Sequence, residues 1–209
     1  VEMVIRSMAR NEGTLASDSK IMADMEEFEG SRIDERTFSE YRDVLDRMFM
    51  TENQPAFDPN YRSNVRVGKN PKRHLTDPAL AAAALDMTPE KLLDDLDLFG
   101  FLFESMCERD LDVYARSLGG KLFHYHDHQN NEADAVIEMP DGRWGAFEIK
   151  LGMNQVDSGA AKLLELRSYM EKKGVKRLPS VLAVICGKES SAYRRDDGVY
   201  VLPITSLRN

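Results

Sequence analysis

The feature that most constrains this chain is a pair of adjacent strand-like segments that carry two acids and a lysine. Asp134 lies in the first segment, Glu148 and Lys150 lie in the second, and Pro140-Asp141-Gly142 separates the two. A spacing of two places Glu148 and Lys150 on the same face of a strand. Carboxylate oxygens bind hard cations such as Mg²⁺, and a lysine can orient an attacking water or neutralise charge on a phosphate. The pattern therefore predicts a divalent-metal site on a hairpin.

The length of the hairpin loop decides whether the two acids share a face. A two-residue turn would pair Asp134 with Ile149 and send the acids to opposite faces. A three-residue loop from Pro140 to Gly142 pairs Asp134 with Glu148 instead. Proline suits the first position of a type I turn, and glycine suits the left-handed position that follows it. We therefore predict the second register, although the same alternation also describes a hairpin with one solvated face and cross-strand Glu–Lys pairs.

Bulk composition indicates a globular protein. The chain has 209 residues, of which 42% are hydrophobic and 31% are charged. No apolar run approaches the roughly 20 residues that span a bilayer, and no basic-then-apolar signal segment is present. Cys107 and Cys186 both lie in apolar surroundings, which favours free thiols in a reducing compartment. We expect a cytoplasmic protein without a membrane partner. We also expect a piece of a longer chain, because Val1 falls in a helical pattern.

Charge is distributed unevenly along the chain. The formal net charge of −8 argues against a generally basic nucleic-acid binder. Residues 60–74, however, contain no acid and five cations: Arg62, Arg66, Lys69, Lys72 and Arg73. This stretch could contact phosphate, or it could be an ordinary solvated loop or hairpin.

Residues 1–78 show the element order of a winged-helix unit. Apolar spacing predicts a helix that ends near Ala9, a second capped by Ser17 and a third capped by Asp34. Two extended segments, near 48–57 and 65–76, follow them. The third helix of such a unit usually reads DNA, but here it mixes acids with arginines. We therefore favour a protein-docking or spacer role.

Residues 97–209 alternate strands and helices. Residues 79–96 form connecting helices, with start signals at Asp77-Pro78 and Thr88-Pro89. We then expect a long helix over 98–118, a strand over 122–126, the hairpin, a helix over 156–173, a strand over 181–186 and a final hairpin that turns at 196–198. Tyr193-Arg194-Arg195 is expected on a loop before that turn. This order predicts an α/β domain with a mixed sheet and flanking helices.

The helix–hairpin–helix–strand order with D…E-x-K resembles the core of the restriction-endonuclease-like (PD-(D/E)xK) superfamily. The resemblance implies that Lys150, Glu148 and Asp134 are catalytic. It also implies that Mg²⁺ or Mn²⁺ binds Asp134, Glu148 and an acid of the preceding helix, for which Glu104 is the match. Two weaker candidates after the E-x-K strand are Gln155 and Lys162. The superfamily's proline before the first acid is replaced by Ala133.

A closer resemblance covers nearly the whole chain. Its motifs are Arg6-Ser7-Met8-Ala9-Arg10-Asn11, Thr37-Phe38-x-x-Tyr41-x-x-x-Leu45, Lys72-Arg73-His74-Leu75-Thr76-Asp77-Pro78, Phe103-Glu104, Glu132-Ala133-Asp134 and Phe147-Glu148-Ile149-Lys150. This pattern is similar to the C-terminal half of prokaryotic AAA+-type ATPases that carry a domain of unknown function. The resemblance implies an N-terminal ATPase module of the same chain as a partner, with ATP bound only there. The present residues contain no G-x-x-x-x-G-K-[ST] loop.

These observations leave three functional hypotheses. The first is a Mg²⁺-dependent nuclease that hydrolyses phosphodiesters of DNA. The second is a non-catalytic adaptor that binds nucleic acid or a protein, in which the same residues form mutual ion pairs. The third is a zinc or transition-metal site at His124, His126 and His128, which alternate along a strand. Trp144 falls on the same strand face as Glu148, where it would cover the acids or stack on a ligand.

Overall fold

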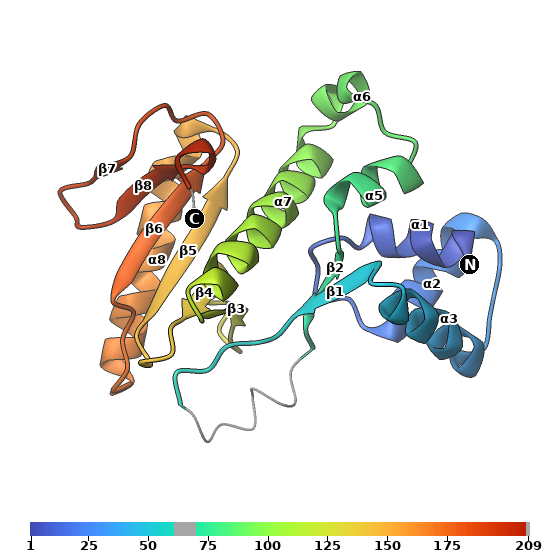
Figure 1. Cartoon of the computed structure of the whole chain (residues 1–209), viewed down its shortest axis with the longest axis horizontal. Coiled ribbons are helices and arrows are strands. Elements are labelled where there is room, and N and C mark those ends of the chain that lie inside the picture. Colours follow the sequence, from blue (N-terminus) through green and yellow to red (C-terminus); the bar gives the residue numbers. More distant parts are fainter. Residues whose placement is uncertain (61–69, 208–209) are drawn as a thin grey trace. The chain divides into compact units, whose positions relative to one another are not determined.

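The computed structural model describes residues 1–60 and 70–207 and shows a mixed α/β protein (Figure 1). Its internal contacts divide the chain into two compact units. The first unit comprises Val1–Gln54 and Asn70–Met106, and the second comprises Pro55–Lys69 and Cys107–Asn209. The units therefore interleave in sequence. The domain boundaries 1–78, 79–96 and 97–209 stay a prediction.

The first unit is mainly helical. Its elements are α1 (Glu2–Arg10), α2 (Asp18–Glu29), α3 (Glu35–Arg47), β1 (Thr51–Gln54), β2 (Lys72–Leu75), α5 (Pro78–Ala84), α6 (Pro89–Asp94) and the first part of α7 (Leu96–Ser117). Its core is a cluster of buried apolar side chains drawn from α1, α2, α3 and α5, among them Val4, Ile21, Met25, Phe38, Leu45 and Ala81. β1 and β2 pair antiparallel, and an isolated antiparallel bridge joins Thr14 to Arg73.

The predicted helix starts in this unit are confirmed. The hydroxyl of Ser17 accepts a hydrogen bond from the Lys20 amide at the start of α2. The carboxylate of Asp34 accepts one from the Thr37 amide at the start of α3. Each cap satisfies one of the backbone donors that a helix N-terminus leaves unpaired.

The second unit is built on a six-stranded mixed sheet. Its elements are the rest of α7, β3 (Lys121–His126), β4 (Glu132–Glu138), β5 (Trp144–Lys150), η1 (Met153–Gln155), α8 (Val156–Lys172), β6 (Val181–Cys186), β7 (Tyr193–Arg194), β8 (Tyr200–Pro203) and η2 (Ile204–Ser206). The strand order is β3-β4-β5-β6-β8-β7. The β5–β6 and β6–β8 pairs are parallel and the other pairs are antiparallel. Tyr193 and Arg194 pair as β7, so the prediction of a loop there is wrong.

The β4–β5 hairpin has the predicted register. Ala135 pairs with Phe147, and the Met139 amide donates to the Arg143 carbonyl at 2.8 Å. The loop therefore consists of residues 140–142, and Gly142 closes it with φ of 83°, a conformation that suits glycine. Asp134 and Glu148 are the next residues beyond the Ala135–Phe147 pair on the two strands.

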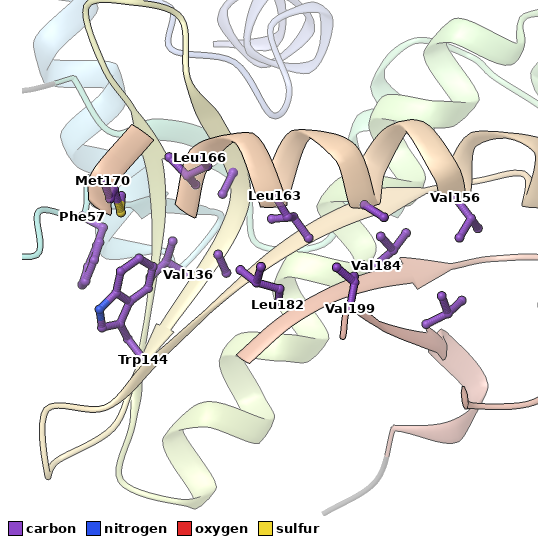
Figure 2. Close-up of a cluster of buried hydrophobic side chains, with 14 of the residues drawn as sticks. Phe57, Val136, Trp144, Val156, Leu163, Leu166, Met170, Leu182, Val184 and Val199 are labelled. Carbon is purple, nitrogen blue, oxygen red and sulfur yellow. The ribbon is translucent and has the colours of Figure 1, made fainter. Parts of the chain in front are cut away.

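One face of the sheet packs against α8. Val156, Leu163, Leu166 and Met170 on the helix meet Val136, Leu182 and Val184 on the strands (Figure 2). The rings of Trp144 and Phe57 complete this core at the C-terminal end of α8, with ring centroids 4.7 Å apart. Trp144 thus packs into the core, and its indole N–H donates to the Arg177 carbonyl at 3.1 Å.

No helix within residues 1–60 and 70–207 is both long enough and apolar enough to cross a membrane.

Candidate functional site

Three of the predicted site residues come together on the face of the sheet that packs against α8. The Lys150 ammonium lies 2.6 Å from Glu148 Oε2 and 3.5 Å from Asp134 Oδ2. Both carboxylates therefore lie beside one positive charge, as the register predicts. We call Asp134, Glu148, Lys150 and Lys162, which reaches them from α8, the Glu148 cluster.

An irregularity in β4 and a backbone contact position the Asp134 carboxylate. Phe123 pairs with Val136 and Tyr125 pairs with Ala133, so two residues of β4 oppose one residue of β3 at this point. Asp134 is one of those two. Its Oδ2 accepts a hydrogen bond of 2.7 Å from the Ile149 amide on the neighbouring strand. Such bulges commonly re-aim side chains next to active sites.

Glu148 is the most unusual side chain of the cluster. It is completely buried, and neither carboxylate oxygen has a hydrogen-bond partner among the described residues. The close contact with Lys150 is thus an ion pair that is poorly aligned for hydrogen bonding. Burial, and then the neighbouring Asp134 carboxylate, raise the pKa of Glu148 to about 7, although Lys150 and Lys162 oppose this shift.

Helix α8 supplies a second lysine. Lys162 Nζ lies 3.0 Å from Glu132 Oε1 and 3.8 Å from Glu148 Oε2. Burial by itself would lower the pKa of Lys162, but Glu148 and Glu132 raise this pKa above its ordinary value. Of the two weaker candidates, Lys162 thus reaches the cluster. Gln155 instead accepts a hydrogen bond from the Gly152 amide.

Gly159 is the point where the backbone of α8 faces the cluster. A Cβ at this position would lie 3.4 Å from the Lys150 side chain and 3.5 Å from Glu148 Cβ. The sequence analysis did not identify Gly159. A glycine inside an otherwise regular helix is the signal that could have pointed to it, because such a glycine often marks close packing.

Glu104 belongs to the first unit, and its Oε1 atom lies 2.5 Å from Lys72 Nζ of the same unit. The second unit by itself contributes two acids of the predicted metal set, Asp134 and Glu148. Across residues 1–60 and 70–207, no group of three or more His, Cys, Asp or Glu side chains has an arrangement that could hold a metal ion. His124, His126 and His128 therefore do not form such a group either.

The strand that carries His124 and His126 takes part in packing and backbone pairing instead. His124 is buried, its amide donates to the Pro55 carbonyl, and its carbonyl accepts from the Phe57 amide. His126 ends β3, and His128 lies in the turn that follows. His124 is therefore packed inside the second unit.

The acid-free basic stretch is partly engaged within the first unit. Lys72 pairs with Glu104, and an Arg73 guanidinium nitrogen lies 2.7 Å from Asp18 Oδ1. The remaining three cations, Arg62, Arg66 and Lys69, lie outside the described residues.

Two families match the chain. The family described as Domain of unknown function (DUF4143) matches residues 99–207, and the one described as Domain of unknown function (DUF8612) matches residues 1–91. DUF4143 is often found in AAA-ATPase-associated proteins. No curated protein and no solved structure matches the chain.

Proposed function

The chain belongs to the DUF4143 family, and we propose that its second unit is a metal-dependent nuclease centred on the Glu148 cluster. One observation carries this proposal. Glu148 is fully buried beside a second carboxylate, and its pKa is raised to about 7 by burial and by Asp134 even though Lys150 and Lys162 form ion pairs with it. A buried carboxylate in this condition costs folding free energy. Such costs concentrate at functional sites.

The donor set fits Mg²⁺ or Mn²⁺. Mg²⁺ usually keeps several waters and binds proteins through one or two carboxylates together with substrate phosphates. Asp134 and Glu148 would supply those two carboxylates. A divalent charge there would also relieve the repulsion that raises the pKa of Glu148.

The two acids and Lys150 would then have different tasks. Asp134 and Glu148 hold the cation, and the hydrogen bond from the Ile149 amide keeps Asp134 oriented. When bound, the cation lowers the pKa of a water and neutralises charge on the leaving oxygen. Lys150, freed from its ion pair with Glu148, holds the scissile phosphate or the attacking water. The proposed catalytic set within the second unit is thus Asp134, Glu148 and Lys150.

The element order supports the wider assignment. A hairpin bearing the acids, a crossover helix and a parallel strand follow one another as β4, β5, α8 and β6, which is the order of a restriction-endonuclease-like core. In the first unit, three helices precede the β1–β2 pair, which is the order of a winged helix. We propose an ATPase module of the same protein as the partner and DNA as the substrate.

Cleavage of plasmid or branched DNA in Mg²⁺ tests the proposal. We expect the Asp134→Ala and Lys150→Ala variants to lose at least about 100-fold in rate, because each removes a group that stabilises charge in the transition state. Lys121→Ala is a matched control, since Lys121 is an exposed lysine at the start of β3. Cleavage that persists unchanged in both cluster variants would rule this site out.

A second candidate is a non-catalytic adaptor of the ATPase that binds nucleic acid or protein. The ion pairs in and beside the cluster favour it, because Lys150 already balances Glu148 and Lys162 balances Glu132. Isothermal titration calorimetry separates the two candidates. Mg²⁺ or Mn²⁺ binding that disappears in Asp134→Asn supports the nuclease, whereas no binding at millimolar concentrations supports the adaptor.

A further inference from the structure

The second unit contains a pocket that the proposed chemistry does not use. It has a volume of about 210 Å³ and lies between the C-terminal end of α8, the end of β3 and residues 57–60. An apolar cavity of about 150 Å³ can hold benzene, so the pocket has room for one ring system. It is smaller than the roughly 300–1,000 Å³ typical of sites for drug-sized ligands.

The lining of the pocket combines aromatic side chains with polar ones, among them Asp58, Asn60 and Asp127. Three rings contribute, from Phe57, Tyr125 and Tyr169, together with the thioether of Met170. The hydroxyl of Tyr125 contacts Asp127 Oδ2 at 3.3 Å, and burial, followed by Asp127, raises the pKa of this tyrosine. Tyr125 is therefore an uncharged ring that is held in place at the pocket.

Positive charge lies beside these rings. Lys173 also lines the pocket, and its ammonium lies 5.6 Å from the centroid of the Tyr169 ring. Lys172 and Lys176 are exposed nearby in sequence. Rings flanked by exposed lysines match a nucleotide unit, in which a flat base is joined to an anionic backbone.

The pocket and the Glu148 cluster share the same elements. Tyr125 pairs with Ala133, the residue that precedes Asp134. Tyr169 lies seven residues after Lys162 on α8, which corresponds to about 10 Å along the helix, or the rise of about three stacked nucleotides. A strand whose phosphate is held at the cluster can therefore reach the pocket with a base about three nucleotides away.

We propose that this pocket holds a base of a single-stranded nucleic acid whose backbone runs toward the Glu148 cluster. The inference rests on the proposed nuclease function, whose substrate it specifies as a strand with unpaired bases. Stacking on tyrosine and phenylalanine is tolerant of base identity because every base has a π-face. The site therefore selects unpaired nucleotides rather than a sequence.

Binding measured without hydrolysis tests the pocket separately from catalysis. Fluorescence anisotropy of the full chain with a labelled oligothymidylate is recorded in EDTA, and the same strand with abasic sites is compared. We expect the abasic strand to bind about ten-fold more weakly, as loss of a stacked base predicts. Tyr169→Ala should remove this preference and Tyr169→Phe should keep it. Tyr193→Ala, at an exposed tyrosine of β7, is the matched control.

Photo-cross-linking of a bromodeoxyuridine strand to the unmutated protein covers the case in which Tyr169→Ala fails to fold. We expect cross-links in peptides that contain Phe57, Tyr125 or Tyr169. Equal affinity for intact and abasic strands, cross-links confined to other peptides, or thymidine monophosphate that competes as well as the strand would overturn the proposal. Base-dependent binding without Mg²⁺-dependent cleavage would uphold the pocket and refute the nuclease.

Discussion

At the scale of single residues, Glu148 determines how the second unit responds to pH. An ordinary glutamate ionises near 4.5, whereas burial and Asp134 raise the pKa of Glu148 to about 7. Between these values the folded protein retains a proton that the unfolded chain has released. The contribution of Glu148 to the free energy of unfolding therefore falls as pH rises through this window, and it levels off above pH 7.

Glu148→Gln should abolish this dependence, because glutamine stays neutral. The variant's unfolding free energy minus that of the wild type should grow by on the order of 3 kcal/mol from pH 4.5 to pH 7.5. This follows because one pKa unit corresponds to about 1.4 kcal/mol. Trp144 is the chain's single tryptophan and lies in the second unit, so its fluorescence during urea unfolding reports on this unit. Glu165→Gln, at an exposed glutamate of α8, should follow the wild type. Parallel pH curves for wild type and Glu148→Gln would show that Glu148 does not titrate in this window.

At the scale of elements, the hairpin was predictable because its turn chemistry is local. Pro140 and Gly142 specify a three-residue loop, and the loop sets the pairing of Ala135–Glu138 with Trp144–Phe147. The acids then share a face without any information from the rest of the chain. The convergence of Asp134, Glu148 and Lys150 follows from that register.

The irregularity in β4 was not predictable in the same way. It depends on how β3 pairs with β4, and β3 also receives a backbone bridge from Ala56, far away in sequence. The position of Lys162 likewise depends on the rotation of α8 about its axis, which packing against the sheet decides. Both are tertiary effects that local patterns do not encode.

Gly159 offers a prediction about α8. A Cβ there would make ordinary contacts, at 3.4 Å, with Lys150 and Val184. Gly159→Ala should therefore fit and stabilise the second unit by about 0.5–1 kcal/mol, because alanine is the better helix former. Urea unfolding followed by Trp144 fluorescence measures the change, with Gly159→Leu as the oversized comparison that should destabilise. A loss of stability in Gly159→Ala would mean that α8 lies closer to the cluster than these distances indicate.

At the scale of the whole molecule, two separate segments of the chain form the second unit. The amide of Phe57 donates to the His124 carbonyl at 2.7 Å, and the His124 amide donates to the Pro55 carbonyl at 3.0 Å. The Phe57 ring contacts Trp144 in the core (Figure 2). Sequence patterns treat residues 48–57 as one extended segment of the N-terminal part. They cannot show that its end packs with strands that follow much later.

This interleaving predicts that a substitution outside the α/β region weakens it. The Phe57 side chain is 1% exposed and contacts the rings of Phe123 and Trp144, so Phe57→Ala should cost about 3–5 kcal/mol through lost burial and a residual cavity. The urea midpoint of Trp144 fluorescence in the full chain should fall accordingly. Phe49→Ala is the matched control, since Phe49 is 82% exposed and its loss should change stability by no more than about 0.5 kcal/mol. Equal urea midpoints for Phe57→Ala and Phe49→Ala would show that residues 55–60 are not part of the second unit's core.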